Sequence, residues 1–93
     1  MKHIVYGLAS IIASDDVAEA VIEYAAALAQ SRDSDVVTVP TYDFSGSTTQ
    51  VQVMLGAGIP VLIQDAPEDE LETPNPEFVA ELHARGAGRR GDA

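Results

Sequence analysis

The chain contains no cysteine, and this absence excludes several kinds of site at once. Disulfide frameworks, thiolate nucleophiles and cysteine-ligated zinc sites all require that side chain. Long uninterrupted apolar runs are missing as well, although a membrane-spanning helix needs about 18 or more such residues. We therefore expect a cytoplasmic protein without a membrane span.

Basic side chains are scarce, since five Lys and Arg stand against 15 Asp and Glu and give a formal net charge of −10. Between Ile4 and Leu82 the only basic side chain is Arg32. Nucleic acids and anionic membranes are bound by clusters of Lys and Arg that neutralise phosphates. We expect neither as a partner. The abundant Ala, and Arg in excess of Lys, are typical of a GC-rich bacterial genome or of its phages.

Catalytic motifs are also missing. His3 and His83 stand at opposite ends of the chain, and no GxSxG turn or P-loop spacing occurs. Asp15 and Asp16 are neighbouring carboxylates, but the start of a helix explains both of them. We expect a protein that is not an enzyme, with no cofactor and no metal site.

Ninety-three residues are enough for one hydrophobic core. Ser14 as a cap and two aspartates in the first turn predict a long helix. Runs rich in β-branched residues predict strands before and after it. The sequence therefore predicts an α+β domain in the order ββαβββ, with one long helix packed on a mostly antiparallel sheet and a short C-terminal helix. The expected strands are 3–6, 10–13, 35–42, 48–55 and 59–64, and the expected helix is 15–31.

Residues 47–55 admit an alternative interpretation as a second helix, capped by Ser47 and ended by Gly56, which would give a βαβαβ fold with a parallel sheet. The alternation of apolar and polar residues favours a half-buried strand instead. On that interpretation one face carries Thr49, Val51, Val53 and Leu55.

The composition divides the chain into four segments. Residues 1–64 form the expected α+β core domain, and 65–76 form an acidic, proline-rich linker. A short helix is expected over 77–86, supported by an i,i+4 pair between Glu81 and Arg85 and ended by a glycine. Residues 87–93 are expected to form a mobile tail.

The long helix carries two apolar stripes. One is suited to packing on the sheet, and the second consists mostly of small side chains. The second stripe is either covered by the C-terminal helix or used for self-association. Pro40 lacks an N–H group and indicates either an edge position or the end of the strand over 35–42. An edge strand at these residues would be able to pair with a second copy. The predicted interface residues are Ala18, Ile22, Ala25, Ala29, Val37 and Val39.

An acidic run follows the last expected strand and has no EF-hand spacing. We interpret it as a solvated linker; the alternative is a surface that binds a basic partner, as an acidic inhibitor would. Its members are Asp65, Glu68, Asp69, Glu70 and Glu72.

The segment from Gly46 to Thr49 has the small polar composition of a phosphate cradle, and the βαβαβ fold would place it at a helix N-terminus. It is the basis of an alternative function as a small-molecule or phosphate-binding module. The main hypothesis is a non-enzymatic interaction or self-assembling domain, either a homo-oligomer or bound to another protein, and acting as an accessory, regulatory or virion component.

Overall fold

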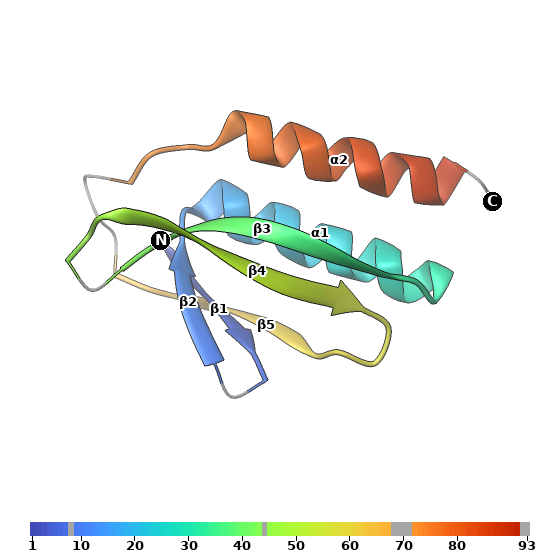
Figure 1. Cartoon of the computed structure of the whole chain (residues 1–93), viewed down its shortest axis with the longest axis horizontal. Helices are drawn as coiled ribbons and strands as arrows, with labels where there is room; N and C mark the ends of the chain where they lie inside the picture. The colour runs from blue at the N-terminus through green and yellow to red at the C-terminus, as the bar shows by residue number, and fades with distance from the viewer. Residues whose placement is uncertain (8, 44, 68–71, 92–93) are drawn as a thin grey trace.

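The computed structural model describes residues 1–7, 9–43, 45–67 and 72–91 (Figure 1). The expected α+β domain with an antiparallel sheet is confirmed. The parallel βαβαβ alternative is wrong, because residues 48–56 form a strand and the strand pairs are antiparallel. The elements in order are β1 (Lys2–Tyr6), β2 (Ala9–Ala13), α1 (Asp15–Ser31), β3 (Ser34–Tyr42), β4 (Thr48–Gly56), β5 (Val61–Asp65) and α2 (Pro76–Gly91).

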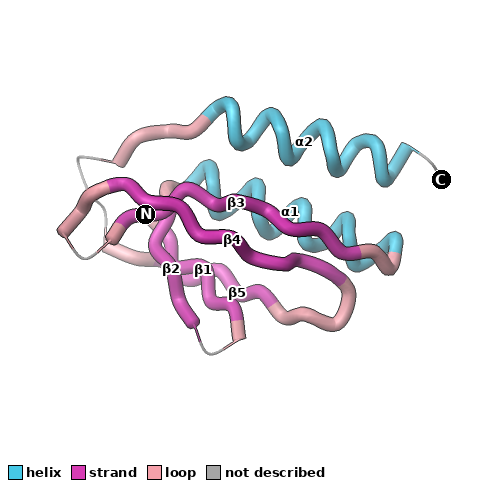
Figure 2. Tube along the Cα trace, in the orientation of Figure 1, coloured by secondary structure: helices cyan, strands magenta, loops and turns pink. Residues whose placement is uncertain are grey.

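The sheet has the strand order β4-β3-β2-β1-β5 and consists of two parts. β3 and β4 form a long hairpin, whereas β1 pairs with both β2 and β5. β2 and β3 are paired at one position, where Ile12 lies opposite Tyr42. The Tyr6 hydroxyl also donates to the Met54 carbonyl and so connects β1 to β4. Figure 2 shows the hairpin running along α1 while β1 and β2 are inclined to it.

The predicted edge position of residues 35–42 is only partly right, because the strand order places β3 between β4 and β2 but the pairing with β2 is limited to Tyr42. Pro40 is tolerated there since the pairing with β2 is confined to Tyr42. The edges of the sheet are β4 and β5.

The core forms where α1 contacts the sheet, and alternation along the strands decides which side chains enter it. On β4, Leu55 is buried and Met54 is exposed, as the predicted pattern requires. Among the described residues, the large exposed apolar side chains are Val36, Met54 and Leu62, at 50 to 55% exposure. Each neighbours a residue that packs in the core, so all three lie on the face of the sheet that points away from α1.

The first turn of α1 differs from the expected capping. The Ser14 side chain makes no capping bond to the helix backbone. Its hydroxyl donates to the Asp16 carboxylate, which accepts the Val17 N–H at 2.9 Å. The second carboxylate oxygen of Asp16 accepts the backbone N–H of Asn75 at 2.7 Å. Asp16 therefore connects the start of α1 to the residue that precedes α2.

α2 packs on α1 through Leu82, whose exposure is 1%. The Nε2 atom of His83, the next residue of α2, lies 3.4 Å from a carboxylate oxygen of Glu23 on α1. The predicted end at Gly86 is wrong, because α2 continues to Gly91. Gly86 is buried within the helix, and packing of this kind offsets the low helix propensity of glycine. Most of the expected mobile tail is thus helical, and its last two positions lie outside the described residues.

Leu82→Ala is expected to lower the free energy of unfolding by about 2 to 5 kcal/mol, because it leaves a cavity between the helices. Urea denaturation followed by circular dichroism measures the change. The exposed Glu77→Asp variant on the same helix keeps the first-turn carboxylate and is the control, with an expected change within about 0.5 kcal/mol. Equal stability of the two variants would contradict the packing of α2 on α1.

Candidate functional site

One flank of the molecule is lined by α1, the β4–β5 loop and β5. Two adjoining grooves lie along it and share Ile22 and Val61. One groove, which we call the upper groove, lies against the C-terminal half of α1. The other, the lower groove, continues along β5 past Leu62 and Ile63 toward Lys2. We call this surface the α1/β5 flank and define it by Ile22, Ala25, Ala26, Ala29, Ile59, Pro60, Val61 and Leu62.

The backbone of β5 has a free side at this flank. The Ala66 N–H donates to the Met1 carbonyl at 3.3 Å, in register with the pairing of β1 and β5. Because hydrogen-bonded and non-hydrogen-bonded pairs alternate in an antiparallel ladder, Leu62 and Gln64 also bond to β1. The backbone N–H and C=O groups of Val61, Ile63 and Asp65 then point in the plane of the sheet toward its free edge, on the side of β5 opposite β1. Over the described part of the chain, no strand lies beyond β5 to pair with them.

The flank carries little charge. Residues 45–64 contain no ionisable side chain, although the whole chain has a net charge of −10. At the N-terminal end of α1 the lower groove reaches Asp15, Glu19 and Lys2, and the Lys2 ammonium is paired with Asp65. Charge is therefore confined to one end of an otherwise apolar surface.

The predicted interface residues divide between the core and this flank. Ala18, Val37 and Val39 are at most 2% exposed, so the chain itself buries them and they are not available at its surface. Ile22 and Ala25 are half-buried and Ala29 is exposed, all three on the flank. The contribution of β5 was missed at the sequence level. The signal that was available is the apolar, uncharged run 59–63.

The predicted acidic surface does not form one cluster over the described residues. Asp65 pairs with Lys2, and Glu72 lies 2.5 Å from the α-amino group of Met1. Asp15 bonds the same amino group at 2.9 Å. The hydrogen bonds that this amino group donates to Glu72, and next to Asp15, raise its pKa to about 10. Glu68, Asp69 and Glu70 lie outside the described residues.

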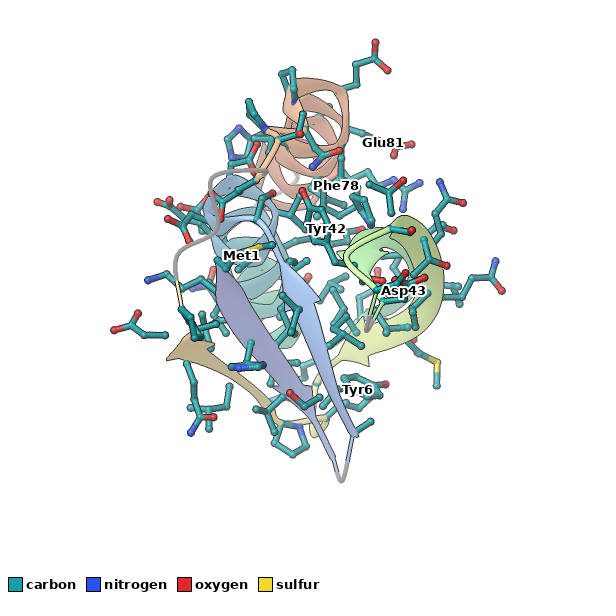
Figure 3. The ribbon with its side chains drawn as sticks, turned by 90° about the vertical axis from the view of Figure 1, so that its left-hand side faces the viewer. Met1, Tyr6, Tyr42, Asp43, Phe78 and Glu81 are labelled. Atoms are coloured by element: carbon teal, nitrogen blue, oxygen red, sulfur yellow. The ribbon has the colours of Figure 1, made fainter. Side chains whose placement is uncertain are left out.

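At the segment from Gly46 to Thr49, one backbone amide, that of Ser47, is already bonded to a carboxylate of the chain itself, as is the amide of the preceding Ser45. Asp43 accepts the N–H groups of Ser45 at 2.9 Å and Ser47 at 3.0 Å. Hydrogen bonds from Ser45, and next from Ser47, lower the pKa of Asp43. The turn leads into β4 and not into a helix, so the anion-site hypothesis loses its helix N-terminus. Figure 3 shows Asp43 at this end of the hairpin.

A polar cleft lies between the hairpin and the segment that leads to α2. Tyr42 is part of its wall, and its hydroxyl oxygen accepts the Thr73 N–H at 3.1 Å. Most of the described lining residues carry a hydroxyl or an amide group, and none of them has a carboxylate or a basic side chain. The lining residues are Pro40, Thr41, Tyr42, Thr48, Thr49, Gln50, Thr73 and Asn75.

A polar cluster that was not anticipated from the sequence joins α1, β3 and α2. The Tyr24 hydroxyl donates to Asp35 at 2.5 Å, and Arg85 donates to the same carboxylate oxygen at 3.1 Å. Arg85 also donates to Glu81 at 3.1 Å, which confirms the expected i,i+4 pair. The Tyr24 hydrogen bond is the main cause of a lowered pKa at Asp35, and the Arg85 charge adds to it. The contacts within the cluster indicate that it positions α2.

Within the described ranges, no group of three or more His, Asp or Glu side chains is placed to hold a metal ion. Neither helix, over the same ranges, has the length and apolarity needed to cross a membrane. No protein family model matches the chain, and no curated protein or solved structure is significantly similar to it. The α1/β5 flank is the candidate site, because two adjoining grooves lie there beside a free edge of the sheet.

Tyr24→Phe is expected to cost about 1 kcal/mol of stability at pH 7, because it removes a hydrogen bond to a charged carboxylate. A carboxyl group with a lowered pKa in the folded state stabilises the fold above its unfolded pKa, near 3.8, and this contribution is lost as the pH falls through the folded pKa. The difference between wild type and Tyr24→Phe is thus expected to shrink below about pH 4.

Urea denaturation at pH 7, 4 and 2.5 measures this difference. Tyr42→Phe serves as the control, since its hydroxyl oxygen accepts a backbone N–H and the bond involves no carboxylate. A Tyr24→Phe effect of the same size at all three pH values would show that the bond to Asp35 does not depend on its charge.

Proposed function

We propose that this protein is a non-enzymatic interaction domain that binds another protein chain through the α1/β5 flank. The observation that carries this proposal is the unpaired side of β5 beside an uncharged apolar groove. The domain would act as a small accessory, regulatory or virion component.

The free backbone groups of β5 support the proposal. An exposed sheet edge presents N–H and C=O groups that can bond to a strand of another chain, and proteins that avoid such pairing place charges or prolines along the edge. Pro60 precedes β5, and Asp65 ends it beside Lys2. Between them lie Val61, Leu62, Ile63 and Gln64, which carry no charge.

The groove beside the edge adds side-chain recognition to the backbone pairing. Addition of a strand to a sheet edge gives affinity through the main chain, and pockets along the edge select side chains. Ile22, Ala25 and Ala29 line the grooves next to β5, so an added strand would contact α1 as well as the edge. A groove of this kind would favour an apolar side chain on the partner.

Two of the described carboxylates have roles within the fold. The carboxylates of Asp35 and Asp43 are hydrogen bonded within the chain, and both have a lowered pKa. A general acid or base that works near neutral pH needs a pKa shifted in the opposite direction. These groups are suited to holding the fold together.

The test is a pair of variants that each add one negative charge. Ile22→Glu places a carboxylate in the shared part of the two grooves, and Val36→Glu places one on the opposite face of the sheet. We expect Ile22→Glu to reduce association at least 10-fold while Val36→Glu leaves it unchanged. Association is measured as mass by light scattering, and as binding of proteins from the natural host to the immobilised chain.

Circular dichroism and the unfolding midpoint establish that both variants are folded. Equal association of the wild type and the two variants would contradict the proposal, as would a loss of association in Val36→Glu alone.

A further inference from the structure

We propose that the strand added to β5 is β5 of a second copy, antiparallel to the first and related to it by a two-fold axis at Leu62. The inference rests on the proposed function and names the partner. Two copies joined in this way form a closed dimer whose sheet runs through both chains.

The backbone of β5 fits this arrangement. Val61 and Ile63 have their N–H and C=O groups directed outward, and the axis at Leu62 places Val61 of each copy opposite Ile63 of the other. These two positions become hydrogen-bonded pairs. The two Leu62 residues then face each other in a non-hydrogen-bonded pair, with their Cα atoms about 4.5 Å apart.

The side chains agree with the same register. Val61 and Ile63 pack toward the core of their own copy. In the dimer, Val61 of each copy lies next to Ile63 of the other copy on that face of the sheet. Leu62 points to the opposite face and is 53% exposed in the single chain. The axis at Leu62 covers it with its own counterpart, so apolar residues meet apolar residues on both faces.

Charge favours a second copy over a basic partner. A basic protein would gain from contact with carboxylates, and residues 45–64 contain none. A second copy carries a net charge of −10 itself and can approach closely only where charge is absent. The β5 edge meets this condition, and Asp65 at its end is paired with Lys2.

The size of the flank indicates a weak dimer. α1 has 17 residues and the shortest extent of the molecule is 19 Å. A helix of this length spans about 25 Å, so two facing flanks of this length and thickness bury at most about 1,000 Å² in total, near the lower limit for a specific interface. We therefore expect dissociation on dilution. Added salt is expected to strengthen the dimer, since it screens the repulsion between two acidic chains.

β4 provides the matched control, because it is the other edge of the same sheet. Met54 on β4 is 50% exposed and lies on the same face as Leu62. The chain has no cysteine, so Leu62→Cys and Met54→Cys each introduce a single thiol. Facing residues of a non-hydrogen-bonded antiparallel pair are close enough for a disulfide.

The experiment oxidises both variants gently and follows covalent dimers on non-reducing gels, with the mass of the wild type measured by light scattering over the same concentrations. We expect Leu62→Cys to cross-link at least 10-fold faster than Met54→Cys, at concentrations where the wild type is dimeric. Reduced Leu62→Cys, with its unfolding midpoint compared with that of the wild type, establishes that the variant is folded.

A wild-type dimer in which Leu62→Cys cross-links no faster than Met54→Cys would overturn the pairing and leave the proposed function standing. A wild type that stays monomeric at millimolar concentration and at both salt levels would overturn it as well. In that case the proposed function is tested separately, by comparing how much host protein the wild type, Ile22→Glu and Val36→Glu bind. Faster cross-linking of Met54→Cys would move the interface to β4.

Discussion

The alanine-rich helix α1 supplies much of the apolar surface of this small protein, and the other elements are arranged so as to bury it. Its buried residues form a wide arc, Val17, Ala18, Ala20, Val21, Tyr24, Ala27 and Leu28. The sheet covers the middle of this arc. α2 packs along one side, where Leu82 enters the core and His83 meets Glu23.

The placement of α2 determines which surface stays open. Asp16 holds the residue before α2 at the start of α1, and Asp35 holds Arg85 further along the helix. These two polar contacts keep α2 beside α1 along its length, as Figure 1 shows. The other side of α1, with Ile22 and Ala29, is left next to the free edge of β5. Burial of α1 by one short chain thus leaves an apolar flank, and a second chain can complete it.

Periodicity predicted the elements well because it is a local property. The bounds of α1 agree with the expected 15–31, and the alternation along 48–55 identified both the strand and its buried face. The same property does not specify the order of the strands. Pro40 predicted an edge position for Val37 and Val39. The strand order places β3 inside the sheet, but β3 pairs with β2 only at Tyr42, so no β2 residue is paired with either valine.

Long-range contacts account for the other differences. β5 becomes an edge only because it pairs with β1, almost sixty residues earlier in the chain. Gly86 was expected to end the last helix on propensity alone, but it is buried in the packed helix and α2 continues. The residues of the Tyr24–Asp35–Arg85 cluster belong to three different elements, so no spacing in the sequence predicts the cluster.

The central claim is that the outward backbone groups of β5 are used by a second chain, and residue-level amide hydrogen exchange tests it most directly. At low protein concentration the amides of Val61, Ile63 and Asp65 are expected to exchange rapidly, while those of Leu62, Gln64 and Ala66 are protected by β1. At high concentration the account predicts protection of Val61 and Ile63 as well. Rapid exchange of these two amides at every concentration, in a sample that light scattering shows to be dimeric, would contradict it.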